Sequence, residues 1–172
     1  MLVAASLLCI ASSAAILLSP FLAPCGSFVF EGGSPGMLDG WWRGHGAAGI
    51  PYAIGDVLCH QEFSRSFVLN GSQLPVCMRD TGIAFGAAVG FSCCAISGRE
   101  SYPRIFAVAG AVLILLMAVE WAVETTGFDS PPLRTCSGAC AGIGASLFLA
   151  WMLYRESDDR QRRCEGSRGM AR

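Results

Sequence analysis

The segment DVLCHQEFSRSFVLNGSQLPVCMRDTGIAFGAAVG, residues 56–90, joins residue types that can bind a metal to a long uncharged stretch. Its first half contains Cys59 and His60, and a Cys-x-x-Asp step follows at Cys77 and Asp80. After Asp80 the chain carries no charge over the eighteen residues 81–98, which is enough for a helix that spans a bilayer. The segment therefore predicts a membrane helix with a polar site at one end.

Three other apolar stretches flank this segment, at about residues 1–19, 105–123 and 135–154. Together the four stretches predict an all-α membrane protein: a bundle of about four transmembrane helices with a long extracytoplasmic loop between the first and the second. We expect a short helix over residues 50–60 of that loop. The membrane domain would then cover residues 1–154, and a charged tail that we expect to be disordered follows at 155–172.

Composition agrees with a bilayer as the surrounding medium. Of the 172 residues, 53% are hydrophobic and only 15% are charged, against about 25% charged in an ordinary soluble domain. The net charge of -1 argues against a nucleic-acid partner, which calls for a basic surface. Residues 1–24 contain no basic residue, so we favour a retained first helix over a cleaved signal peptide.

The arginines indicate an orientation. All twelve basic residues are Arg, and eight of them lie at Arg99, at Arg104 and in the tail. Because basic residues collect on the cytoplasmic side, we expect both termini inside the plasma membrane and the polar site on its outer face.

Glycines recur at a spacing that places them on one helix face. Gly82, Gly86 and Gly90 lie four residues apart in the second stretch, and Gly138 and Gly142 repeat the spacing in the fourth. Small residues at this spacing let two helices approach closely. The pattern predicts packing of the second helix on the fourth, and the alternative is a contact in a homo-oligomer or with a membrane-complex partner.

An ionisable residue inside a span is costly and suggests a function. Glu120 lies late in the third stretch, and Arg79 or Arg134 is its expected partner. These three residues are our catalytic candidates, with Glu120 as a general acid or base. The alternatives are that Glu120 reaches the membrane surface, or that it only pairs with an arginine and holds the helices together.

The first half of the segment offers a second site. Cys59, His60, Cys77 and Asp80 are the ligand types of a zinc site. Two simpler interpretations stay open: a disulfide between Cys59 and Cys77 in an oxidising compartment, and an Asp80 that only caps the second helix.

The motifs CHQ at 59–61, RSF at 65–67 and PVCMRDTG at 75–82, with Gly86, resemble domain-of-unknown-function family 2085, a family of membrane proteins of archaea and bacteria. Glu120-Trp121 and the step from Ser130 to Arg134 resemble a later part of its pattern. The resemblance covers about residues 50–150 and implies no particular reaction.

Two departures from the family pattern are informative. Asp80 stands where the family has a second Cys, and Glu120 stands where it has Asp. A redox pair of cysteines would be abolished by Asp80, whereas a metal site would keep a ligand.

The leading hypothesis is an integral membrane protein that binds a Zn-like metal on its outer face and acts on an anionic or lipid-linked substrate, with Arg65 and Gln61 as substrate ligands. One alternative is a structural or accessory subunit with a Cys59–Cys77 disulfide and Arg–acid pairs. Another is a small transporter subunit with Glu120 as the coupling carboxylate. Whether the protein is an enzyme stays open.

Overall fold

The computed structural model describes residues 1–30, 40–97, 104–128 and 130–169, and most of them are helical. Four helices are long and apolar enough to cross a membrane. They are α1 (Leu2–Leu18), which the 3-10 turn η1 (Ser19–Phe21) extends, α3 (Met78–Ser97), α4 (Arg104–Glu124) and α5 (Pro131–Gly169). The predicted fold class is confirmed, including the long segment between the first and second spans.

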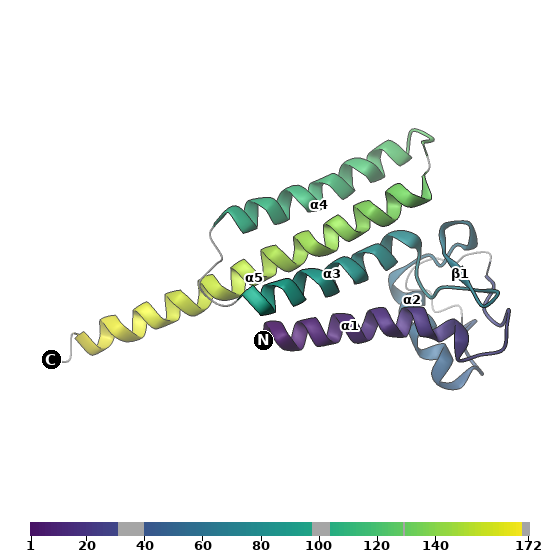
Figure 1. Ribbon diagram of the computed structural model, residues 1–172, viewed down its shortest axis with the longest axis horizontal. Helices are drawn as coiled ribbons and strands as arrows, with labels where there is room; N and C mark the ends of the chain where they lie inside the picture. The colour runs from purple at the N-terminus through teal and green to yellow at the C-terminus, as the bar shows by residue number, and fades with distance from the viewer. Residues whose placement is uncertain (31–39, 98–103, 129, 170–172) are drawn as a thin grey trace.

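The four helices lie side by side in the order α1, α3, α5, α4 (Figure 1). Helix α3 packs against α1 and α5, and α5 packs against α4. Consecutive spans are therefore not always neighbours, and α5 lies between α3 and α4. This order brings the beginnings of α3 and α5 to the same end of the molecule as the end of α4 (Figure 1).

The lipid-facing character of the spans is clearest on α4. Val108, Leu115 and Val119 are 62%, 61% and 59% exposed. Burial of apolar surface stabilises by roughly 25 cal/mol per Å², so leaving these side chains in water is unfavourable. A bilayer around the helices removes that cost, as in other helical membrane proteins.

The first residue of α1 and the far end of α5 lie at the end of the bundle opposite the folded segment between α1 and α3 (Figure 1). Helix α5 continues to Gly169, so residues 155–169, which we expected to be disordered, extend the last span as a helix. The connection that contains Arg99 lies outside the described residues.

The segment between α1 and α3 is folded, and we call its described residues, 19–30 and 40–77, the cap. It contains the 3-10 turns η2 (Gly46–Ala48) and η3 (Phe63–Arg65), helix α2 (Gly49–Leu58), and strands β1 (Val68–Leu69) and β2 (Ser72–Gln73). Helix α2 confirms the short helix expected over residues 50–60. The strands pair antiparallel around Asn70-Gly71, both with positive φ, the favoured two-residue hairpin turn.

Aromatic stacking and one buried amide hold the cap together. Phe28 stacks on Tyr52 with ring centroids 3.8 Å apart. The Tyr52 hydroxyl donates a 2.7 Å hydrogen bond to the Gln73 carbonyl, and the Phe30 N–H donates to the Gln73 side chain at 3.0 Å. Burial raises the pKa of Tyr52 to about 12, so its hydroxyl stays a donor at neutral pH. The cap can therefore hold a site rigidly against the helix ends.

Candidate functional site

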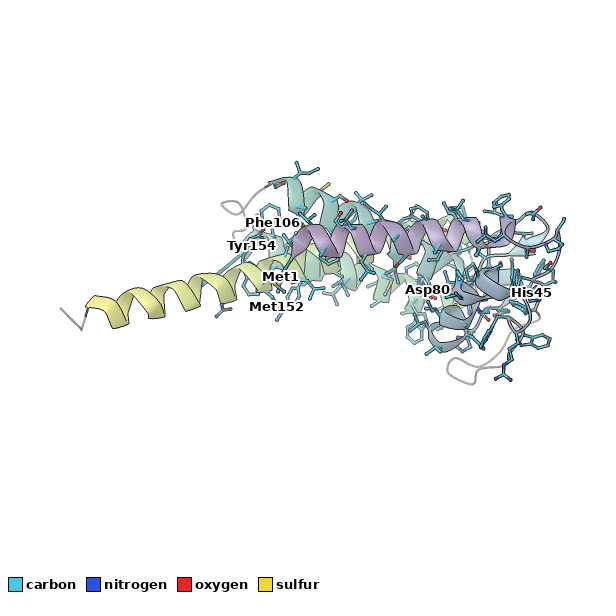
Figure 2. All side chains as sticks on the ribbon, turned by 90° about the horizontal axis from the view of Figure 1, so that it is seen from below. Met1, His45, Asp80, Phe106, Met152 and Tyr154 are labelled. Carbon is cyan, nitrogen blue, oxygen red and sulfur yellow. The ribbon has the colours of Figure 1, made fainter. Side chains whose placement is uncertain are left out.

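Cys59, Cys77 and Asp80 come together where the cap meets the bundle. Cys59 caps the end of α2 with an extended backbone conformation. Cys77 lies directly before α3, and Asp80 lies in its first turn. One ligand atom from each residue lies within 4.8 Å of the other two. Figure 2 shows Asp80 at this junction of helices and cap.

Two hydrogen bonds link the three residues, one from a backbone N–H and one between side chains. The backbone N–H of Cys77 donates to Cys59 Sγ at 3.2 Å. The Cys77 thiol donates to Asp80 Oδ2, also at 3.2 Å. Cys59 is 7% exposed, and both cysteines are free thiols here. Asp80 thus accepts a hydrogen bond from the Cys77 thiol. Its carboxylate also lies at the N-terminal end of α3, where the helix dipole is positive.

The two thiols differ in acidity. The interaction between the two thiol side chains is the main influence on the acidity of both: a hydrogen bond between them lowers the pKa of Cys77 and raises the pKa of Cys59. Burial raises the pKa of Cys59 further, because a thiolate there would lose its hydration. The pair therefore gives up its first proton at Cys77, whose thiolate the remaining Cys59 thiol stabilises.

His60 lies beside the cluster without joining it. Its side chain is exposed, and its ring nitrogens are not among the grouped ligand atoms. His60 does line a cavity of about 270 Å³, and Cys59, Cys77 and Asp80 also form part of the wall of this cavity. Of the four predicted metal ligands, the structure therefore gathers three and places the fourth on the wall of the same cavity.

Three arginines meet two glutamates directly beside the cluster. Arg79 of α3 donates to Glu120 at 2.8 Å and to Glu124 at 2.5 Å, both near the end of α4. Arg134 of α5 donates to Glu124 at 2.6 Å, and Arg65 of the cap also pairs with Glu124. We call these five residues the arginine–glutamate network. It connects the cap to the ends of three spans.

The network decides between the partners that the sequence left open. Glu120 pairs with Arg79, which is one of its two expected partners, and it also accepts a 3.0 Å hydrogen bond from the Ser137 hydroxyl. Arg134 pairs with Glu124 instead. The Glu120 side chain is only 8% exposed and is not among the cavity-lining residues, whereas all three arginines line the cavity.

Gln61 has a structural environment that the sequence did not indicate. Its backbone is left-handed, with φ of 49°, and its side chain is buried. The amide nitrogen donates to the carbonyls of Tyr52 at 3.0 Å and Pro75 at 2.8 Å. Gln61 is not among the residues that line the cavity, so its role as a substrate ligand stays a prediction.

The predicted packing glycines lie between α3 and α5. A Cβ at Gly82 or Gly86 would collide with backbone of Thr135 or Ala139, and one at Gly90 with Ser146. From the other side, Gly138 and Gly142 meet the backbone of α3 in the same way. Close approach of these two helices brings Arg79 and Arg134 to the same glutamate.

Glu124 belongs to the network but was not among the candidate site residues chosen from the sequence. It binds all three arginines, and its side chain is 12% exposed. A signal was present in the sequence: Glu120 and Glu124 are four residues apart, so they lie on the same face of α4. The spacing did not show that three arginines from other segments converge on that face.

The helices and the site define a class of protein: a four-span α-helical membrane protein whose polar site lies under a small folded cap. A family model described as Predicted membrane protein (DUF2085) matches residues 59–148, which include the cluster and the network, and the chain belongs to this family. No curated protein and no solved structure matches the chain.

Proposed function

We propose that this membrane protein binds a Zn-like metal ion at Cys59, Cys77 and Asp80, and that the arginines beside the ion hold an anionic ligand. The observation that carries the proposal is the convergence of two thiols of the cap and a carboxylate of the first turn of α3 within 4.8 Å. Thiolate and carboxylate ligands suit zinc.

The spacing supports a shared ion. Ligands bound at about 2.0–2.3 Å in a tetrahedron lie about 3.3–3.8 Å from one another. Cys77 Sγ and Asp80 Oδ2 are already 3.2 Å apart. The third atom, Cys59 Sγ, lies close enough that a small side-chain rotation completes the set. Because the ligands are thiolates when they bind an ion, the two thiol protons leave on binding.

Three protein ligands leave a fourth position for water, for His60 or for a ligand from the cavity. Structural zinc sites have four protein ligands, whereas catalytic sites keep one position open. His60 is exposed on the cavity wall and would have to turn inward to bind. The open position would face a cavity that three guanidinium groups line.

The arginines are suited to an anion because guanidinium groups bind phosphate and carboxylate through paired hydrogen bonds. Arg65 is the most accessible of the three, with a side chain 37% exposed, against 16% for Arg79 and 6% for Arg134. We therefore assign Arg65 to direct ligand contact. Glu120 and Glu124 hold the arginines in position, and Glu120 as general acid or base stays a prediction.

A structural role is the second candidate, and the arginine–glutamate network favours it. Removing one partner of a buried ion pair typically costs about 3–5 kcal/mol, so the network can hold the helix ends together without any ligand. In this alternative Cys59 and Cys77, whose sulfurs lie within 4.8 Å, form a disulfide in an oxidising compartment. The transporter role stays a prediction.

Metal content separates these candidates. The full-length protein is purified in mild detergent without a His tag or chelator, and its zinc and iron are measured by elemental mass spectrometry. Near-stoichiometric metal in the wild type and its loss in Cys77→Ser and Asp80→Asn support the metal site. Cys25→Ser, which changes an exposed cysteine of the cap, is the matched control and keeps the metal.

Metal absent from wild type and variants alike would overturn the metal proposal. Mass analysis without reductant then shows whether the peptides of Cys59 and Cys77 are linked and together two hydrogen atoms lighter, as a disulfide requires. His60→Ala is measured in the same series, because loss of metal in that variant would make His60 the fourth ligand.

A further inference from the structure

Helix α2 leaves a row of apolar side chains exposed. Ile50, Ile54 and Leu58 are 59%, 56% and 70% exposed. The acidic side chain of the helix, that of Asp56, is instead buried: it is 3% exposed and accepts a 3.1 Å hydrogen bond from the Trp42 indole. A surface helix in water presents charged and polar residues on its exposed face. The outer face of α2 is therefore suited to apolar surroundings.

The exposed side of α2 forms a groove that adjoins the polar cavity. The groove has a volume of about 440 Å³, and its walls include Trp42, Ile50, Ile54, Val57 and Leu58. Leu58 also lines the cavity of the metal cluster. One side chain thus separates an apolar groove from a polar cavity.

The end of α2 lies where α3 begins its span. A Cβ at Gly55 would collide with the carbonyl of Pro75, two residues before Cys77, so the two segments touch. Cys59 then receives the hydrogen bond of the Cys77 N–H. The apolar span of α3 starts at Met78, directly after Cys77. The groove therefore lies at the boundary where hydrocarbon chains and headgroups of a bilayer meet.

Arg65 offers the best contact for an anionic group. It shares the Glu124 carboxylate with Arg79 and Arg134, so three guanidinium groups meet at that one carboxylate. Two further acids, Glu62 and Asp80, line the cavity; the hydrogen bonds that they accept from Ser64 and Cys77 do not cancel a carboxylate charge, so the cavity as a whole has no positive excess. An anion approaches best at Arg65, the most exposed of the arginines.

We propose that the groove and the cavity together bind one anionic membrane lipid, with a hydrocarbon chain along α2 and the headgroup at Arg65. The inference rests on the proposed anion-binding role of the arginines, and it adds that the ligand enters from the bilayer. The contact of Gly55 with Pro75 supports this occupant, because it places α2 beside the start of the α3 span, where lipid surrounds the bundle.

The test uses the full-length protein in nanodiscs of equal parts phosphatidylcholine and phosphatidylglycerol, followed by gentle release and native mass spectrometry. An Ile54→Gln/Val57→Gln variant makes the groove polar without altering the cluster. Arg65→Gln removes the headgroup contact. Val68→Gln is the matched control, since Val68 is 46% exposed on the cap but lies outside the groove.

We expect a phosphatidylglycerol adduct on the wild type and on Val68→Gln. The groove variant loses the adduct of either lipid, and Arg65→Gln loses the preference for phosphatidylglycerol over phosphatidylcholine. Equal adducts on all four proteins, or none on the wild type, would overturn the proposal. Ile54, Val57 and Val68 are exposed, whereas Arg65 is partly buried and pairs with Glu124. Elution of each variant as a single species is therefore the folding control, and it matters most for Arg65→Gln.

Metal content measured in the same samples keeps the two proposals apart. The lipid proposal fails if adducts do not respond to the groove, even when zinc is present in every sample. The metal proposal fails if no sample contains metal, even when the adducts respond as expected.

Discussion

Arg79 at the start of α3 donates a 2.5 Å hydrogen bond to Glu124 at the end of α4, although 45 residues separate them in the chain. Glu124 also binds Arg134 at the start of α5 and Arg65 in the cap. One carboxylate therefore fixes the relative positions of three spans and the cap, at the edge of the cavity that contains the cysteine cluster.

Replacing Glu124 with Gln should destabilise the protein by about 2–4 kcal/mol, because three arginines lose their shared counter-charge in a mostly buried site. The measurement is the midpoint of thermal unfolding in detergent. Glu62→Gln is the control, since Glu62 lies on the same cavity but pairs only with the nearby Ser64 hydroxyl among the contacts described. An unchanged midpoint for Glu124→Gln would show that the network does not hold the helix ends together.

Gly86→Ala should loosen the contact between α3 and α5. A Cβ at Gly86 collides with the backbone of Ala139, and overpacking of this kind costs about 1–3 kcal/mol. The same thermal measurement applies. Ala118→Val is the control, because it adds volume at an exposed position of α4. Equal midpoints for the two variants would mean that the α3–α5 contact adjusts at no cost.

Gln61→Ala should unfold the cap locally while leaving the metal ligands in place. The substitution removes the donor to two buried carbonyls, those of Tyr52 and Pro75, at about 1–3 kcal/mol each. Hydrogen exchange over residues 49–76 should accelerate, whereas Ser64→Ala, at an exposed hydroxyl, leaves it unchanged. Unchanged exchange together with loss of the lipid adduct would instead support Gln61 as a substrate ligand.

In the metal-free, reduced protein, Cys77 should react with iodoacetamide before Cys59. The thiolate is the reactive form, and the pKa of Cys77 is lowered while that of Cys59 is raised. As pH falls from alkaline to neutral, Cys59 should therefore stop reacting first. Peptide mapping of the alkylated sites measures the order, and faster reaction at Cys59 would contradict it. Added zinc should protect both cysteines and leave Cys25 reactive.

The arginine distribution predicts that the cap lies outside the cell membrane. A membrane-impermeant maleimide added to intact cells should then label Cys25, which is exposed on the cap. Cys25→Ser identifies the contribution of this residue to the labelling. A fluorescent protein fused after residue 172 should report a cytoplasmic C-terminus. Labelling of Cys25 only after lysis would reverse the orientation.

The sequence alone determined the class of fold and the residue types of the site. Long apolar stretches are sufficient to predict four spans because hydrocarbon offers the backbone no hydrogen-bond partners outside a helix. The Gly-x-x-x-Gly spacing of Gly82 and Gly86 is a local pattern, so it identifies a packing face. The three-residue separation of Cys77 and Asp80 was also enough to predict that the two side chains lie close together, because one helical turn brings such positions to the same face.

Tertiary structure alone decided which distant groups meet. The sequence offered Arg79 and Arg134 as partners of Glu120, and the row α1, α3, α5, α4 selected Arg79 and made Glu124 the shared partner. The tertiary structure also placed the Gln61 side chain between two backbone carbonyls, and it left Ile54 exposed in the groove beside the cavity. These relationships depend on which segments become neighbours and on how far each is rotated toward the others, and the periodicity of a single segment does not define either.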